Sequence, residues 1–318
     1  MIAFLIRRIG QAIIVVVGVS LIVFLITHML PGSPARAILG IQATPQAVRK
    51  FNAANGYDKP VFVQFFVYWK HLLEGNFGFS YKEDLPVRTL IANRAPKTLL
   101  LVGLGFFFAF LVGIPIGLWQ AVHRNRFDDH LLTSLSFVGY SMPVFWIGML
   151  LIWLLAVANH VFPAGSPSAA SATVGQVLQH PLGLVLPVAT LTFVEAPGVV
   201  RFMRSAAIEN LSEDYVRTAT AKGAPRPRIV LVHVLRNSLL PVITLIGLTL
   251  PLVLSGSIVV EKVFNYPGMG LLMWTAAQTR DYPTLLGGAV VIGVATVVGS
   301  LLADVLYAIV DPRVRFSR

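Results

Sequence analysis

Six long apolar runs, almost free of charge, constrain this chain more than any other feature. They cover residues 10–30, 98–122, 134–158, 181–200, 238–260 and 284–310. A helix needs roughly 20 mostly apolar residues to cross a bilayer, and each run reaches that length. The fourth run contains Glu195 and the sixth contains Asp304, and ionisable groups are costly at membrane depth. The runs predict an all-α integral membrane protein with six transmembrane helices in one domain, residues 1–318.

The composition supports this fold class and excludes others. Hydrophobic residues make up 56% of the chain and charged residues only 12%, whereas a soluble domain carries roughly 25% charged residues. The absence of cysteine excludes disulfides, thiolate metal sites and cysteine nucleophiles. The net charge of +11 indicates basic loops beside anionic lipid rather than a nucleic-acid partner.

The first apolar run has a second interpretation, as a cleaved signal peptide, because Ala35-Arg36-Ala37 resembles a small-residue cleavage site. The run exceeds the roughly 7–15 residues of a signal core, which favours a retained helix.

The distribution of Lys and Arg predicts the orientation. With six spans, the basic segments before residue 10, at 123–133, at 201–237 and at 311–318 all fall on one side, which identifies the cytoplasm and places both termini there. The loops 159–180 and 261–283 are poor in Lys and Arg and face outward. The loop 31–97 is basic yet external, but it exceeds the roughly 60 residues within which the rule holds. We expect it to fold, with a helix at Phe62–Leu73.

Several catalytic signatures are absent from the sequence. No lysine follows a glycine, so the chain has no Walker A loop to bind nucleotide phosphates. No histidine precedes a glutamate, and Gly139-Tyr140-Ser141-Met142-Pro143 lacks the final glycine of a nucleophile elbow. These absences disfavour a membrane enzyme and leave no candidate catalytic or metal-binding residue.

The cytoplasmic segment 201–237 contains the start and stop signals of a short helix, predicted at Glu213–Lys222. The signals are, in chain order, a capping Ser212, acidic Glu213 and Asp214, basic Lys222 and terminating Gly223. A second helical start at Pro227 leads into the fifth span. The short helix fits two roles equally: transfer of force from a partner, or rest among lipid headgroups.

The segment Tyr215–Gly223, followed by Leu240-Pro241, resembles the EAA loop of binding-protein-dependent ABC importer permeases, in the variant of dipeptide, oligopeptide and nickel systems. Further pieces match in family order along nearly the whole chain: His28–Gly32, Asp58–Pro60, Gly75–Gly78, Tyr140–Trp146, Tyr266–Gly268, Arg280–Pro283 and Asp311–Arg313. The resemblance is closest to the B-type permeases. The chain departs from the general signature at Arg217-Thr218-Ala219, and Glu195 is not expected from the family.

The resemblance implies a type I importer permease fold in a prokaryotic cytoplasmic membrane, half of a pathway for di- or oligopeptides. The implied partners are a C-type permease paralogue, two ATP-binding subunits that hold ATP and Mg²⁺, and an external peptide-binding protein; no cofactor is expected on this chain. The residues implied to couple to the ATPase are Glu213, Asp214, Tyr215, Arg217, Thr218, Ala219, Ala221, Lys222, Gly223 and Ala224. Prolines at Pro241 and Pro251 are expected to give the fifth span compliance.

Other functions remain open at this point. Nickel or another small solute is the alternative cargo. Candidate pathway residues are Glu195, Tyr140 and Met142, with Glu195 either contacting a peptide amine or sitting in an internal ion pair. A proton-coupled secondary transporter that uses Glu195 and Asp304 is a different class, and a membrane enzyme or passive scaffold is a third.

Overall fold

A computed structural model describes residues 2–29, 35, 39, 42–166 and 169–310. The matched segments Pro31-Gly32 and Asp311–Arg313, and the basic tail, lie outside these residues. Within the described residues, five helices are long and apolar enough to cross a membrane. They belong to α1 (Ile2–Met29), α5 (Val87–Val122), α9 (Leu182–Leu211), α12 (Leu235–Ser255) and α15 (Tyr282–Val310).

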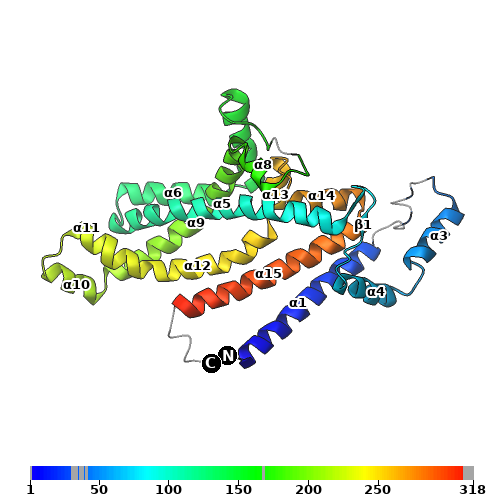
Figure 1. Cartoon of the computed structure of the whole chain (residues 1–318). Helices are drawn as coiled ribbons and strands as arrows, with labels where there is room; N and C mark the ends of the chain where they lie inside the picture. Colours follow the sequence, from blue (N-terminus) through cyan, green and yellow to red (C-terminus); the bar gives the residue numbers. More distant parts are fainter. Residues whose placement is uncertain (1, 30–34, 36–38, 40–41, 167–168, 311–318) are drawn as a thin grey trace.

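The third apolar run is broken rather than straight. It forms α6 (Phe127–Ser141) and then α7 (Val144–Leu151), which continues into a π-helix, η1 (Ile152–Ala158), and the two parts meet at 103°. The break lies at Met142-Pro143, because proline has no N–H to donate and forces the preceding residue into extended backbone. In Figure 1 the second part is the green helix that rises away from the long bundle. Six spans are present only if this bent pair counts as one.

The closest helix pair in the bundle is α5 with α9. A methyl group at Gly105, Gly113 or Gly117 would come within 2.6–2.7 Å of atoms on α9. These glycines therefore let the two backbones approach closely. Gly103, on the same helix, faces open space instead.

We call the end of the bundle that the charge pattern predicts to face outward the outer end, and the opposite end, rich in Lys and Arg, the inner end. The outer end has more structure than expected. Gly256, at φ +85°, ends α12, so the helix formed by the fifth apolar run stops before residue 260. The next loop contains α13 (Ile258–Val263) and α14 (Met269–Thr279), and α8 (Val174–Leu178) lies in the loop before α9.

The segment between the first two spans is folded, and its predicted helix is confirmed. It contains α3 (Pro45–Asn55), α4 (Val61–Leu73) and the antiparallel strands β1 (Phe79–Ser80) and β2 (Leu85–Pro86). The segment is shorter than predicted, because residues 87–97 already belong to α5.

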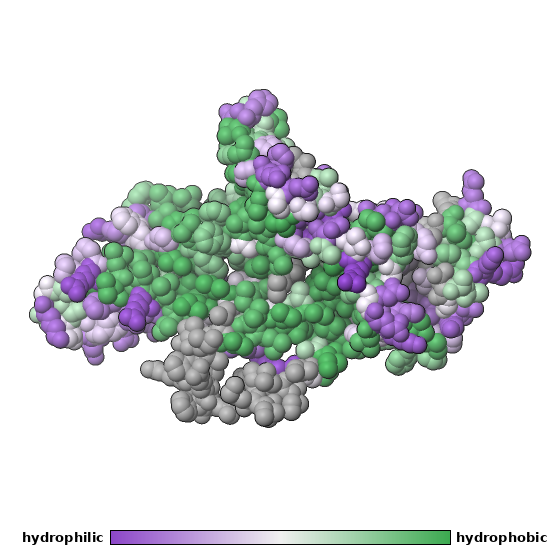
Figure 2. All heavy atoms as spheres, in the orientation of Figure 1, coloured by the Kyte–Doolittle hydropathy of each residue, from purple (hydrophilic) through white to green (hydrophobic). Residues whose placement is uncertain are grey.

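The inner end of the bundle contains α10 (Asp214–Ala221), α11 (Arg226–Arg228) and a second π-helix, η2 (Ile229–Val234), which runs directly into α12. Figure 2 shows hydrophilic residues gathered at both ends of the long axis and on the projecting arm, with a mostly apolar surface along the bundle between the two ends. That distribution matches helices that cross a bilayer end to end.

Candidate coupling site and the polar network beside it

The short helix α10 lies at the inner end of the bundle, between α9 and α12 (Figure 1). Its predicted bounds are nearly right, but its cap is not Ser212. Helix α9 runs on to Leu211, and the Ser212 hydroxyl donates to the carbonyl of Glu209 at 2.7 Å. Ser212 therefore ends α9, and Glu213 takes the extended N-cap position without a side-chain cap bond.

One face of α10 packs against the bundle. Val216 is buried, and Tyr215, Ala219 and Ala224 pack with it against a core cluster from α5, α9, η2 and α12. The Tyr215 hydroxyl donates to Oδ1 of Asn210 at 2.8 Å, which fixes α10 to the last turn of α9. These contacts hold α10 to the membrane helices as one unit.

The other face of α10 is open. Asp214 and Arg217 form an exposed i,i+3 ion pair with 3.2 Å between Nη1 and Oδ1. Six residues share this face or flank it, and all are exposed: Glu213, Thr218, Thr220, Ala221, Lys222 and Gly223. A helix with one apolar face packed on the bundle and one exposed polar face can bind in a groove on another protein.

Gly223 reverses the chain after α10. Its φ of +76° is in the left-handed region, which glycine adopts without strain. Its N–H donates to the Thr220 carbonyl at 2.9 Å, and the Ala224 N–H donates to the Ala219 carbonyl at 3.1 Å. From α11 the chain passes through η2 into α12 without an intervening loop.

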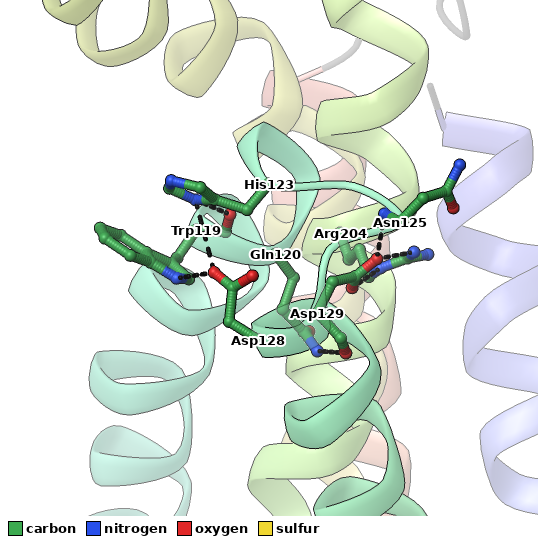
Figure 3. A network of polar contacts seen from close by, with 7 residues as sticks. All are labelled: Trp119, Gln120, His123, Asn125, Asp128, Asp129 and Arg204. Carbon is green, nitrogen blue, oxygen red and sulfur yellow. Dashed lines mark hydrogen bonds and ion pairs between the residues drawn. The ribbon is translucent and has the colours of Figure 1, made fainter.

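A polar network lies near this end of the bundle, at the turn between α5 and α6 (Figure 3). Arg204 on α9 donates from Nε and Nη2 to the two carboxylate oxygens of Asp129, at 2.8 and 2.7 Å. Asp129 also accepts the Asn125 N–H at 3.0 Å. Gln120 on α5 donates to the Asp129 carbonyl at 3.3 Å. The network joins three helices through one residue, Asp129, whose carboxylate pairs with Arg204 and whose backbone carbonyl accepts from Gln120.

A second group of polar contacts at the same turn is partly exposed. The indole N–H of Trp119 donates to Oδ2 of Asp128 at 3.0 Å, and His123 Nδ1 lies 3.9 Å from the same oxygen (Figure 3). Sequence reasoning missed the whole network, because Asp129 and Arg204 are 75 positions apart.

A second buried network, also missed, joins the outer ends of α5, α13 and α14. Glu261 is 0% exposed and accepts hydrogen bonds from the Thr98 hydroxyl at 2.6 Å and the Leu271 N–H at 2.9 Å. Burial raises the pKa of Glu261, although these hydrogen bonds oppose the shift. The Tyr266 hydroxyl donates to the Lys97 carbonyl at 2.8 Å, and burial raises the pKa of Tyr266 as well.

The three candidate pathway residues lie on two helices. Tyr140 is in the last turn of α6, two residues before Met142 at the α6–α7 break, and its ring is 6.0 Å from the Arg201 guanidinium carbon. Glu195 is half-buried on α9 and forms no ion pair within the described residues. Asp304 pairs instead with Arg8 of α1, with 2.5 Å between Nη2 and Oδ2. Among the described residues, no group of three or more His, Asp or Glu side chains could hold a metal ion.

The architecture defines the class: an integral membrane protein whose apolar helices carry a short, partly exposed helix at one end of the bundle. The family described as "Binding-protein-dependent transport system inner membrane component" matches residues 113–316, and its N-terminal counterpart matches residues 1–102. The chain belongs to this family of inner-membrane ABC importer permeases.

Relatives match along their whole length. The chain is 35% identical to the dipeptide transport system permease protein DppB of Escherichia coli (strain K12), with 100% of both chains covered. It is 36% identical to the oligopeptide transport system permease protein AppB of Bacillus subtilis (strain 168), over 99% of this chain and 100% of the relative. It is 39% identical to the glutathione transport system permease protein GsiC of Salmonella typhimurium, again over 100% of both.

Proposed function

We propose that this chain is one half of a peptide importer and that α10 receives the movement of ATP-hydrolysing partner subunits. The observation that carries the proposal is the two-sided packing of α10. Val216 and Tyr215 fix it to α9, η2 and α12, while Thr218 and Ala221 stay exposed. A partner that grips the exposed face would move α12 with it.

The proposed assembly has four kinds of subunit. This chain and a C-type permease form the pathway, two ATP-binding subunits dock at the α10 end, and an external binding protein delivers the cargo at the α3–α4 end. Alternation between outward and inward access then follows the nucleotide state of the partners. The basic residues around α10 and α11 support a cytoplasmic position for that end.

Peptides are the proposed cargo because the permeases named above serve dipeptides, an oligopeptide and the tripeptide glutathione. Nickel, the alternative cargo, has less support because none of the three relatives named above is a nickel permease.

Site-specific cross-linking tests the docking role of α10. Thr218→Cys and Ala221→Cys, in the complete transporter, should each form an adduct with an ATP-binding subunit in a nucleotide-dependent way. Lys82→Cys is the matched control, because Lys82 is exposed at the opposite end of the helix bundle. It should form no adduct. Active transport without any adduct from α10 would contradict the proposal.

The energy source needs its own measurement. Uptake into vesicles should stop with vanadate or without ATP, and should persist with a protonophore. The opposite pattern would favour a proton-coupled transporter.

A further inference from the structure

A pocket of about 220 Å³ lies between α6 and the inner half of α9. Arg201 and Arg204 line it from α9, and Phe137 and Tyr140 line it from α6. Pockets that enclose a whole drug-sized ligand measure about 300–1,000 Å³. The smaller volume fits one end of a larger molecule.

The two arginines in this pocket differ in their charge balance. Arg204 is paired with both oxygens of Asp129. Arg201 lies one helical turn earlier, is exposed, and forms no ion pair within the described residues. Its guanidinium carbon is 6.0 Å from the centre of the Tyr140 ring. The pocket therefore has one uncompensated positive charge, which favours an anionic ligand.

Gln120 supplies an independent observation at the same pocket. Its side chain is 1% exposed and its Nε2 donates to the Thr133 hydroxyl at 3.1 Å and the Asp129 carbonyl at 3.3 Å. Its Oε1 is buried and has no hydrogen-bond partner in the part of the chain that the structure describes. Exchanging the two amide atoms would set Oε1 against the Asp129 carbonyl, so the present assignment is the consistent one. A buried acceptor without a donor is costly, and a ligand N–H would satisfy it.

A ligand that matches both Arg201 and Gln120 Oε1 therefore presents an anionic oxygen and an N–H donor in one small group. The last residue of a peptide has both, a carboxylate and an amide N–H. Phosphatidylglycerol would pair with Arg201 but has no N–H for Gln120, and the ammonium of phosphatidylethanolamine would bring a second positive charge beside Arg201.

We propose that this pocket binds the C-terminal residue of a peptide cargo, with Arg201 on the carboxylate and Gln120 Oε1 on the amide N–H. Val200 and Phe137 then contact its side chain. The proposal rests on the proposed function and adds to it a site at the inner half of the membrane.

Transport by the complete complex in vesicles gives the first test, with trialanine and trialanine amide as the probes. Uptake by each variant is divided by wild-type uptake of the same peptide, so selection by the binding protein cancels. Arg201→Gln should lower this ratio for trialanine by about tenfold, the value of one charge-assisted hydrogen bond, and leave it near one for the amide. Arg201→Lys should restore most of the loss, because it keeps the charge. Arg228→Gln, exposed on α11, is the control.

The outcomes separate this proposal from the proposed function. Equal loss for both peptides in Arg201→Gln would overturn the pocket and leave the importer intact. Failure of the wild-type complex to transport any peptide would contradict the importer instead.

A binding measurement tests the pocket without transport. In the purified complex, benzoylphenylalanine at position 137 should capture labelled trialanine on illumination. Excess trialanine should compete and trialanine amide should not, and Arg201→Gln should abolish capture. No capture by the wild type would overturn the proposal. Capture of phosphatidylglycerol from the vesicles, unaffected by trialanine, would do so in favour of a lipid site.

Discussion

The hydroxyl of Thr98 donates to Oε1 of Glu261 at 2.6 Å while accepting the Met269 N–H at 2.7 Å. One hydroxyl therefore joins a spanning helix, α5, to both short helices of the last outer loop. Both partners are buried, so neither can form a replacement hydrogen bond with water if the hydroxyl is removed. The outer loop is held to the bundle by this contact.

Thr98→Val should destabilise the protein by about 1–3 kcal/mol, because it leaves a buried acceptor and a buried N–H unsatisfied. Thermal unfolding in nanodiscs measures the loss. Thr296→Val is the matched control, since that hydroxyl donates only to the Ile292 carbonyl one turn earlier in its own helix. Equal shifts for the two variants would show that the Thr98 contact has no special weight.

Glu261 should make stability depend on pH in a defined direction. Burial raises its pKa above the ordinary value of 4.5, so the folded chain holds this proton more tightly than the unfolded chain does. The contribution is complete below 4.5 and is lost as pH rises through the raised pKa. The melting temperature of wild type relative to Glu261→Gln should therefore fall with rising pH across that window. Asp58→Asn, at an exposed residue of the outer segment, is the control variant.

Breaking the Asp129–Arg204 pair should cost about 3 kcal/mol, the lower end for a buried ion pair because the Arg204 side chain is 29% exposed. Asp129→Asn and Arg204→Gln supply the single variants. Their double variant should recover part of the loss, because no charge is then left unpaired. Strict additivity of the three unfolding free energies would contradict a direct interaction.

Gly117→Val should force α5 and α9 apart, since even a methyl group would meet the Val200 carbonyl at 2.6 Å. We expect a loss of about 1–3 kcal/mol from overpacking, measured by thermal unfolding. Gly103→Val adds the same atoms on the same helix but faces open space, so its effect should be small. A comparable loss at both positions would remove close packing as the cause.

Gly223→Ala tests the reversal after α10. The added methyl meets no atom within 4 Å, so the cost is backbone strain of about 1–2 kcal/mol at φ +76°. The local strain should loosen α10, and uptake should fall while basal ATP hydrolysis by the partners persists. Gly175→Ala is the control, because it meets only Thr173 Oγ1, at 3.8 Å, and its φ is not in the left-handed region. Unchanged uptake would argue against a mechanical role for the reversal.

The sequence predicted the local elements well because their signals are local. The apolar runs located the spanning helices, and the signals ending at Gly223 located α10 within a residue at each end. The prediction that Ser212 caps α10 was wrong, because Ser212 instead follows Leu211 as the C-cap of α9. The 103° bend at Met142-Pro143 was missed because proline within an apolar run can either kink a helix or end it.

The polar part of the site could not be predicted for a different reason. Asp129 and Arg204 meet only because α5 and α9 pack closely, which returns the α5–α6 turn to the side of α9. Neither residue carries a local signal of its partner. The same holds for Thr98 and Glu261, which are 163 positions apart.

The π-helical turn η2, which joins α10 and α11 to α12, has a geometric consequence. A π turn holds one residue more than an α turn. If η2 changed to α-helical geometry, α12 would rotate by about 100° about its own axis. It would also move by about 1.5 Å along that axis relative to α10. The extra residue in the η2 turn can thus convert a displacement at the inner end into rotation of the whole α12 helix.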